Sequence, residues 1–254
     1  MLSVNDFFSG CGGLSQGFKE AGFKIKVAVD KEEAFLKTFS HNFKDSEAKN
    51  LDLGDNNILK DIPKSDIIVA GPPCQGFSLT GPRNIDDPRN KLYLSVFKTL
   101  KLTTPKAFVV ENVRGLKTMW EGNVFKEIIK KFESAGYIVT ESLLNSADYG
   151  VPQIRHRVFI VGIKKELDKK FEFPKPEFDK DNYISCGEAI DNLPSLENGE
   201  LKTNDYNEKP TTNYQRYVMD SNKLYNHEAT LHKQFVKDTI ALVPEGGNYK
   251  DLPK

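Results

Sequence analysis

Four short clusters in this 254-residue chain carry residue types that can do chemistry. The sharpest is Gly71-Pro72-Pro73-Cys74-Gln75-Gly76-Phe77-Ser78, in which two prolines fix the backbone just before a cysteine. A thiolate held rigidly at the end of a strand is a good nucleophile when a helix N-terminus or a nearby cation lowers its pKa. Without further context, a buried cysteine that only packs is the commoner explanation for such a residue.

Two further clusters place polar residues next to other predicted strands. Glu111-Asn112-Val113 follows the apolar stretch Ala107–Val110, so this glutamate should share a sheet edge with Cys74, where an acid beside a nucleophile suits general acid catalysis. In Gln153-Ile154-Arg155-His156-Arg157, the two arginines point to the same side of an extended segment. They could hold a phosphate, a carboxylate or a polarised carbonyl. The alternatives are an acidic helix cap and a solvated surface pair of arginines.

The fourth cluster, Asp6-Phe7-Phe8-Ser9-Gly10-Cys11-Gly12-Gly13-Leu14, is a glycine-rich turn after the first predicted strand. Such a turn lets a ligand approach the backbone and the free N–H groups of the next helix. It differs from the dinucleotide fingerprint because Ser15 occupies the third glycine position. Asp30 ends the second predicted strand, about where a carboxylate would accept ribose hydroxyl groups, and Asp52 could meet an adenine amino group. The alternatives are a tight turn and solvated surface acids.

Alternating strands and helices over residues 1–163 must position these clusters. The patterns predict strands at Val4–Phe8, Lys24–Val29, Asp66–Ala70, Ala107–Val110 and Val158–Val161, and helices at Leu14–Ala21, Glu32–Phe43, Asn90–Leu102 and Val124–Phe132. Strands that are apolar throughout and separated by helices predict an α/β fold with a mostly parallel, doubly wound sheet. Ligands of such sheets bind beyond the carboxyl ends of the strands.

Composition limits the class of protein. Lys plus Arg and Asp plus Glu both number 36, so the formal net charge of zero excludes a polycation and an acidic disordered tail. No apolar run approaches the ~20 residues of a membrane span, and the N-terminal stretch is too short and too acidic for a signal peptide. Three widely spaced cysteines favour a reducing, intracellular compartment over a disulfide scaffold.

In order and spacing, the four clusters together resemble the DNA (cytosine-5) methyltransferase family. Residues 6–13 are similar to its cofactor loop, 71–78 to its nucleophile loop, and 111–113 and 153–157 to two further catalytic motifs. The resemblance implies a Rossmann-like, S-adenosylmethionine-dependent methyltransferase fold. It also implies methyl transfer to C5 of a flipped-out cytosine in duplex DNA, within a restriction–modification system in the cytoplasm of a prokaryotic cell. No metal and no membrane are implied.

The resemblance assigns a role to each matching residue. Cys74 would attack C6 of the cytosine, Glu111 would engage N3, and Arg155 and Arg157 would hold the cytosine carbonyl and the nearby backbone. The implied substrate contacts are Pro72, through its carbonyl, and Ser78, Asn112 and Gln153. The implied cofactor contacts are Phe8, Gly10, Cys11, Gly12, Gly13, Asp30, Asp52, Leu53 and Leu92.

The C-terminal part departs from the family pattern. Residues 1–175 are predicted to form the cofactor-binding and catalytic domain, and 176–254 an extension leading toward a target recognition domain that is absent from this chain. We therefore expect a catalytic subunit that needs a complementary chain for full activity, or a truncated enzyme. Two other hypotheses stay open: an RNA (transfer RNA) cytosine-5 methyltransferase, and a catalytically silent regulator that binds cofactor or DNA. A nucleotide-dependent oxidoreductase fits less well because of Ser15 and the Cys74 loop.

Overall fold

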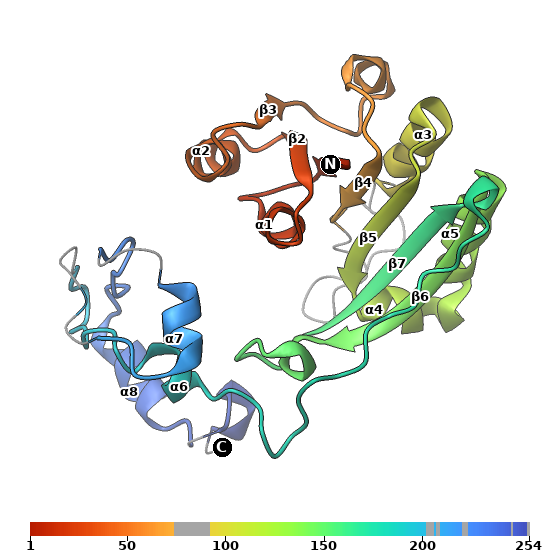
Figure 1. The fold of residues 1–254 in the computed structure, drawn as a ribbon. Helices are drawn as coiled ribbons and strands as arrows, with labels where there is room; N and C mark the ends of the chain where they lie inside the picture. Colours follow the sequence, from red (N-terminus) through yellow and green to blue (C-terminus); the bar gives the residue numbers. More distant parts are fainter. Residues whose placement is uncertain (74–91, 202–205, 207–208, 220–222, 245, 253–254) are drawn as a thin grey trace. The chain divides into compact units, whose positions relative to one another are not determined.

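The structure is a computed structural model that describes residues 1–73, 92–201, 206, 209–219, 223–244 and 246–252 (Figure 1). The chain divides into two compact units. The first consists of Met1–Tyr149 and Ile154–Phe178, and the second of Gly150–Gln153 and Asp179–Lys254. Within the described residues, no helix has both the length and the apolar character needed to cross a lipid bilayer.

A seven-stranded sheet forms the centre of the first unit, in the order β3-β2-β1-β4-β5-β7-β6. Its strands are β1 (Ser3–Phe7), β2 (Lys24–Asp30), β3 (Glu47–Asn50), β4 (Ile67–Ala70), β5 (Ala107–Val113), β6 (Tyr137–Asn145) and β7 (His156–Lys164). Neighbouring strands are parallel except where β7 pairs with β5 and β6. The predicted α/β fold with a mostly parallel sheet is therefore confirmed, although the sequence patterns predicted neither of the edge strands, β3 and β6.

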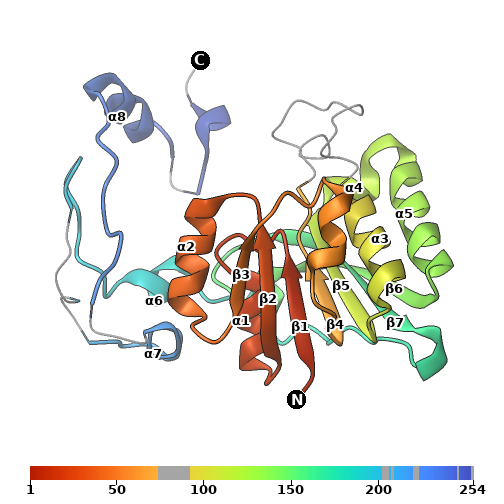
Figure 2. The ribbon, with the colours of Figure 1, turned by 90° about the horizontal axis from the view of Figure 1, so that it is seen from above.

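Helices cover both faces of this sheet (Figure 2). They are α1 (Gly13–Glu20), α2 (Glu33–Asn42), α3 (Tyr93–Thr103), α4 (Gly115–Thr118) and α5 (Asn123–Ser134), with 3₁₀ helices η1 (Asn56–Asp61), η4 (Met119–Gly122), η5 (Ser146–Tyr149) and η6 (Lys165–Leu167). Adjacent residues Ile68 and Val69 of β4 belong to opposite core clusters, as expected for a strand buried on both faces. Phe39 from α2 packs in one cluster, and Phe132 from α5 packs in the other.

The carboxyl ends of β1, β2, β4 and β5 meet at one edge of the sheet, because these strands are parallel. β5 extends further than the sequence pattern predicted, so Glu111 and Asn112 lie within the strand and not after it. The cause is pairing with the antiparallel strand β7, which opposes Val113 to Arg157. This register places the cluster Glu111-Asn112-Val113 beside the cluster that ends at Arg157.

The second unit is smaller, and its regular structure consists mainly of short helices joined by long irregular segments. Its helices are α6 (Cys186–Ile190), α7 (Asn213–Val218), α8 (Gln234–Ala241) and the 3₁₀ helix η7 (Tyr249–Asp251). Capping boxes explain where three of them begin: Ser185 exchanges hydrogen bonds with Glu188, Thr212 with Gln215, and Asn248 with Asp251.

Candidate cofactor pocket and active site

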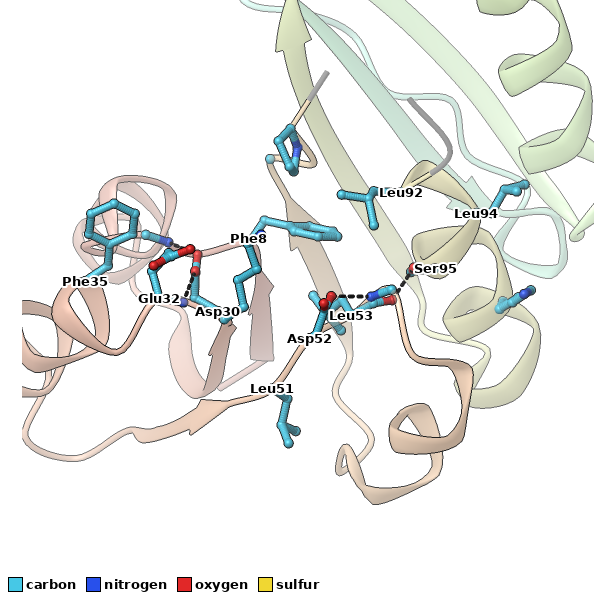
Figure 3. A pocket seen from close by; sticks show the side chains of 16 residues that line it. Phe8, Asp30, Glu32, Phe35, Leu51, Asp52, Leu53, Leu92, Leu94 and Ser95 are labelled. Atoms are coloured by element: carbon cyan, nitrogen blue, oxygen red, sulfur yellow. Dashed lines mark hydrogen bonds between the residues drawn. The ribbon is translucent and has the colours of Figure 1, made fainter. Parts of the chain in front are cut away.

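A cavity of about 650 Å³ opens at the carboxyl ends of β1, β2 and β4 (Figure 3). Its volume is in the range of roughly 300–1,000 Å³ that small-molecule sites occupy. Its lining residues are Phe8, Gly10, Asp30, Lys31, Glu32, Phe35, Leu51, Asp52, Leu53, Gly54, Gly71, Pro73, Leu92, Leu94, Ser95 and Lys98. The cavity thus collects six of the nine predicted cofactor contacts, and Cys11, Gly12 and Gly13 are the three that do not line it.

The glycine turn after β1 has a backbone conformation that most residue types adopt only with strain. Gly10 has a φ angle of +53° and Gly12 one of +97°. A Cβ atom at Gly12 would also lie 2.5 Å from the ring of Phe43. Glycine is therefore required at position 12 by conformation and by space. Cys11 is exposed and Gly13 begins α1, so residues 11–13 shape the turn, whereas Gly10 reaches the cavity.

Asp30, at the end of β2, holds this turn against its strand. Its Oδ2 accepts a hydrogen bond from the backbone N–H of Gly10 at 2.8 Å, and its Oδ1 accepts one from Glu32 at 2.9 Å. A carboxylate has about four acceptor positions, so both oxygens can still accept a hydroxyl group. The position of Asp30 in the cavity wall fits the predicted ribose contact.

Segment 51–54 supplies another wall, and α3 holds it in place. Oδ1 of Asp52 accepts a hydrogen bond from the backbone N–H of Gly54 at 2.8 Å. The hydroxyl of Ser95 donates to the backbone carbonyl of Leu53. Asp52 is therefore fixed by its own turn, with its second oxygen available to a ligand.

The apolar part of the cavity lies close to Asp52. The ring of Phe8 points from the end of β1 toward Leu92, and Leu53 lies on the same side of the cavity (Figure 3). Leu53 is almost fully buried. An aromatic ring and two leucines beside a carboxylate fit a flat heteroaromatic base that carries an amino group.

Sequence reasoning missed ten of the lining residues, and Phe35 shows why. In the predicted helix Glu32–Phe43, Phe35 recurs at helical spacing with Leu36, Phe39 and Phe43. Those three are buried, but Phe35 is 47% exposed and lines the cavity. Adjacent helical positions differ by about 100° in direction, so Phe35 cannot share the face of Leu36. The other nine are Lys31, Glu32, Leu51, Gly54, Gly71, Pro73, Leu94, Ser95 and Lys98. Several of these adjoin Asp30, Asp52 or Leu92, which is the signal that could have found them.

Glu111 on β5 and Arg157 on β7 form an ion pair at the same sheet edge. Nε of Arg157 lies 2.8 Å from Oε1 of Glu111, and both side chains are mostly buried. Burial raises the pKa of Glu111 above its ordinary value, while the charges of Arg157 and Arg155 oppose that rise. A carboxyl group with a raised pKa stays protonated to higher pH, so it can donate a proton or a hydrogen bond.

The end of β4 lies next to this ion pair. A Cβ atom at Gly71 would lie 3.8 Å from Oε2 of Glu111. The backbone carbonyl of Pro72 accepts a hydrogen bond from Nδ2 of Asn112 at 3.1 Å. That carbonyl has a second lone pair for the predicted cytosine amine. The cluster that begins Gly71-Pro72-Pro73 and the cluster Glu111-Asn112-Val113 are therefore in direct contact.

The other predicted site residues are placed as follows. Cys74 and Ser78 lie outside the described residues. Gln153 is exposed and belongs to the second unit. Arg155 immediately precedes β7, and its backbone N–H donates to Oδ1 of Asn145 at 3.1 Å. Its backbone is therefore fixed by the end of β6, while its side chain is exposed to solvent.

The strand order, the antiparallel β7 and the cavity at the carboxyl ends define a Rossmann-like fold of the S-adenosylmethionine-dependent methyltransferase class. The family model for C-5 cytosine-specific DNA methylase matches residues 2–250. The chain therefore belongs to the C-5 cytosine-specific DNA methylase family.

Curated relatives and solved structures agree with this assignment. The chain is 38% identical to the Type II methyltransferase M.DdeI of Desulfomicrobium norvegicum, over 99% of this chain and 63% of that protein. It is 36% identical to the Type II methyltransferase M1.HphI of Haemophilus parahaemolyticus, over 100% of this chain and 64% of that protein. The chain thus spans a little less than two thirds of these relatives.

Two crystal structures have a similar fold. One is described as a DNA modification methyltransferase encoded within a prophage in E. coli; it has a TM-score of 0.73 and 26% identity, over 96% of this chain and 76% of that one. The other is a mutant of Spodoptera frugiperda DNMT2, with a TM-score of 0.55 and 26% identity, over 68% of this chain and 53% of that one.

Proposed function

We propose that this chain transfers a methyl group from S-adenosylmethionine to C5 of cytosine in duplex DNA, through a covalent bond between Cys74 and C6 of the base. The observation that carries the proposal is the position of Gly71. This residue lines the cavity and also adjoins the carboxyl group of Glu111, which is paired with Arg157. A methyl donor in the cavity and a base at Glu111 would therefore meet at the segment that leads directly to Cys74.

The residues of the cavity fit S-adenosylmethionine. Asp30 would accept hydrogen bonds from the ribose hydroxyl groups, and Asp52 would accept one from the amino group of the adenine. Phe8, Leu53 and Leu92 would contact the faces of the base. When it is bound, this cofactor supplies an electrophilic methyl group.

In the proposed reaction, each catalytic side chain acts on the cytosine. The Cys74 thiolate forms a bond to C6, and the protonated carboxyl of Glu111 engages N3, so that electron density rises at C5. Arg157 fixes the carboxyl of Glu111, and the two arginines hold the cytosine carbonyl and the nearby backbone. Once C5 carries the methyl group, loss of the C5 proton and cleavage of the bond between sulfur and C6 restore the aromatic ring and the thiolate.

A cysteine cannot reach C6 inside a stacked duplex, so the proposal requires the target base to be flipped out. The Type II methyltransferase names of the relatives support a modification enzyme of a restriction–modification system, acting on DNA in a prokaryotic cytoplasm. The need for a second chain stays a prediction. It is tested by measuring whether a polypeptide with the remaining third of such a relative raises the rate of methylation.

Replacing the nucleophile tests the proposed reaction. Cys74→Ser should reduce methylation of duplex DNA to background and leave S-adenosylmethionine binding unchanged, because the residue acts on the base. The matched control is Cys186→Ser, which alters an exposed free cysteine at the start of α6 and should leave methylation unchanged. Incorporation of labelled methyl groups and isothermal titration calorimetry give the two readouts.

Two results would contradict the proposed function. One is full methylation activity in Cys74→Ser. The other is failure of the wild-type chain, with a complementing chain present, to form a covalent complex with DNA that contains 5-fluorocytosine. Labelling of transfer RNA in place of DNA would favour the RNA methyltransferase hypothesis.

A further inference from the structure

Asp6, near the carboxyl end of β1, is a carboxylate with no exposed surface. Its Oδ2 accepts two hydrogen bonds from Ser15, one from the backbone N–H at 3.2 Å and one from the hydroxyl at 2.6 Å. Ser15 is also fully buried. Within the described part of the chain, Oδ1 of Asp6 has no hydrogen-bond partner. Burying a carboxyl group with one oxygen unsatisfied is costly, so the contact with Ser15 must offset a sizeable penalty.

Helix α1 lacks a side-chain cap of its own. Its N-cap residue is Gly12, which has a left-handed backbone conformation and no side chain to accept a hydrogen bond. Ser15 is the third residue of the helix, and its N–H is one that an N-cap side chain normally satisfies. Asp6 takes over this role from the neighbouring strand, and when ionised it places a negative charge at the positive end of the helix.

The contact between Asp6 and Ser15 also closes the glycine turn. These two residues lie on either side of residues 7–14, which contain the turn. Within it, the backbone N–H of Gly12 donates to the carbonyl of Ser9 at 2.9 Å, and Gly10 reaches the cavity. Without the contact, the first turn of α1 would lose this link to β1, and the loop between them would keep its own hydrogen bonds and those to Val29 and Asp30 at the end of β2.

We propose that Asp6 is a positioning residue that, by capping α1 through Ser15, holds the glycine turn in the shape that binds the cofactor. Asp6 does not line the cavity, so it acts without touching the ligand. This inference rests on the proposed function because it takes the cavity to be the S-adenosylmethionine site.

Protonation does not break the contact. Burial raises the pKa of Asp6 to about 7; the hydrogen bonds from Ser15 oppose the rise and the charge of Asp30 adds to it. Because Oδ1 has no described partner, a proton on that atom leaves both hydrogen bonds to Oδ2 intact. Asparagine has nearly the same shape and one accepting oxygen, so Asp6→Asn should keep the cap and Asp6→Ala should remove it.

The experiment compares cofactor affinity across four variants of the full chain by isothermal titration calorimetry with S-adenosylmethionine. Asp6→Ala should weaken binding about tenfold or more, since it leaves buried donors of Ser15 without an acceptor. Ser15→Ala should weaken binding by a smaller factor, because the backbone N–H still donates. Asp6→Asn should bind nearly as the wild type. In methylation assays, the KM for S-adenosylmethionine should rise while kcat stays unchanged.

Ser3→Ala is the matched control. Its backbone N–H and hydroxyl donate to Oδ2 of Asp66 at 2.9 and 2.8 Å, the same pattern at the opposite end of the sheet. This variant should lose some thermal stability and no cofactor affinity. If Ser3→Ala weakens cofactor binding as much as Ser15→Ala, the effect reflects general stability and the inference is overturned. Wild-type affinity in Asp6→Ala, or equal losses in Asp6→Ala and Asp6→Asn, would also overturn it.

Hydrogen exchange in the free protein separates this inference from the proposed function. The Gly12 amide should exchange faster in Ser15→Ala than in the wild type, and at the wild-type rate in Ser3→Ala. This readout needs no cofactor and serves if Asp6→Ala does not fold. A wild-type chain that binds no S-adenosylmethionine would overturn the proposed function, whereas an unchanged exchange rate in Ser15→Ala would overturn the role of Asp6.

Discussion

The two ends of the central sheet each have a serine that donates two hydrogen bonds to one aspartate oxygen, yet the pKa values of the two aspartates shift in opposite directions. At the amino ends, Asp66 also forms an ion pair with Lys106 at 2.8 Å. Hydrogen bonds from Lys106 and Ser3 hold the pKa of Asp66 well below its ordinary value. At the carboxyl ends, burial raises the pKa of Asp6 to about 7.

The signs of these shifts give the two ends opposite effects on stability. A depressed pKa means that Asp66 adds stability above pH 3.8, its ordinary pKa, and that this contribution is lost as the pH falls. A raised pKa means that Asp6 binds more protons in the folded state, so stability falls as the pH rises from 3.8 to about 7. The amino ends are thus arranged for stability. The carboxyl ends tolerate an electrostatic cost where ligands bind, as functional sites often do.

The largest expected effect at the carboxyl ends comes from Glu111, because its pKa is also raised by burial. Glu111→Gln should lower kcat for DNA methylation about 10²–10⁴-fold, the usual contribution of a general acid. The amide cannot transfer a proton to the base, and it loses the ion pair with Arg157. Cofactor affinity should not change. Single-turnover assays with labelled S-adenosylmethionine measure the rate.

Glu141→Gln is the matched control for this prediction. Glu141 lies on the edge strand β6 and also pairs with a basic residue, Lys117, at 2.7 Å. Its removal should leave kcat unchanged. Equal losses of activity in the two variants would mean that ion pairs of the sheet act through stability and not through the chemistry at its carboxyl ends.

Replacing Asp52 in the cavity wall should have an intermediate effect, on the affinity for the cofactor. Asp52→Ala should raise the dissociation constant of S-adenosylmethionine about tenfold, the value of one hydrogen bond to a charged group. The control is Asp55→Ala. Both carboxylates accept a hydrogen bond from the N–H two residues further on, but Asp55 does not line the cavity. Calorimetry should show no change for the control, and equal losses would contradict the assignment of Asp52.

The central part of the fold could be predicted because its strands are apolar on both faces. β4, with Ile67–Ala70 fully buried, has the continuous apolar run that indicates a central parallel strand. The edge strands have no such run: β3 is Glu-Ala-Lys-Asn, and β6 is only partly buried after Tyr137. Strands at an edge are covered on fewer sides, so their sequences are too polar for the apolar pattern to find them.

The parts of the cavity wall that depend on local chain conformation could be predicted from the sequence. The turn at Gly10 and the strand end at Asp30 follow from positions in the sequence alone, whereas Asp52 was assigned by the resemblance to the family. The pairing of Glu111 with Arg157 depends instead on the register between β5 and β7, which no local pattern specifies. The contact between Asp6 and Ser15 was not predicted either, because the sequence identified Asp6 only as part of the glycine-rich turn. Its role depends on how α1 folds back onto β1.

Among the variants at the two ends of the sheet, the smallest expected effect comes from the amino ends. Asp66→Asn should lower the free energy of unfolding by about 1 kcal/mol at pH 7, because a partly exposed ion pair and its hydrogen bonds are worth little more in water. Urea denaturation measures this change, and cofactor affinity should not alter. The difference between the variant and the wild type should shrink as the pH falls below about 4, where the wild-type carboxylate loses its contribution.

Glu33→Gln sets the baseline for this measurement. It removes an exposed pair with Lys37 and a negative charge in the first turn of α2, and should change stability by a few tenths of a kcal/mol. The two ends of the sheet differ only if changes in stability and changes in cofactor affinity come from different residues. Asp66→Asn should change unfolding without changing binding, whereas Asp52→Ala should change binding more than unfolding. If Asp66→Asn weakened cofactor binding as Asp52→Ala does, the amino ends would be coupled to the cavity. The division between a stabilising end and a binding end would then be wrong.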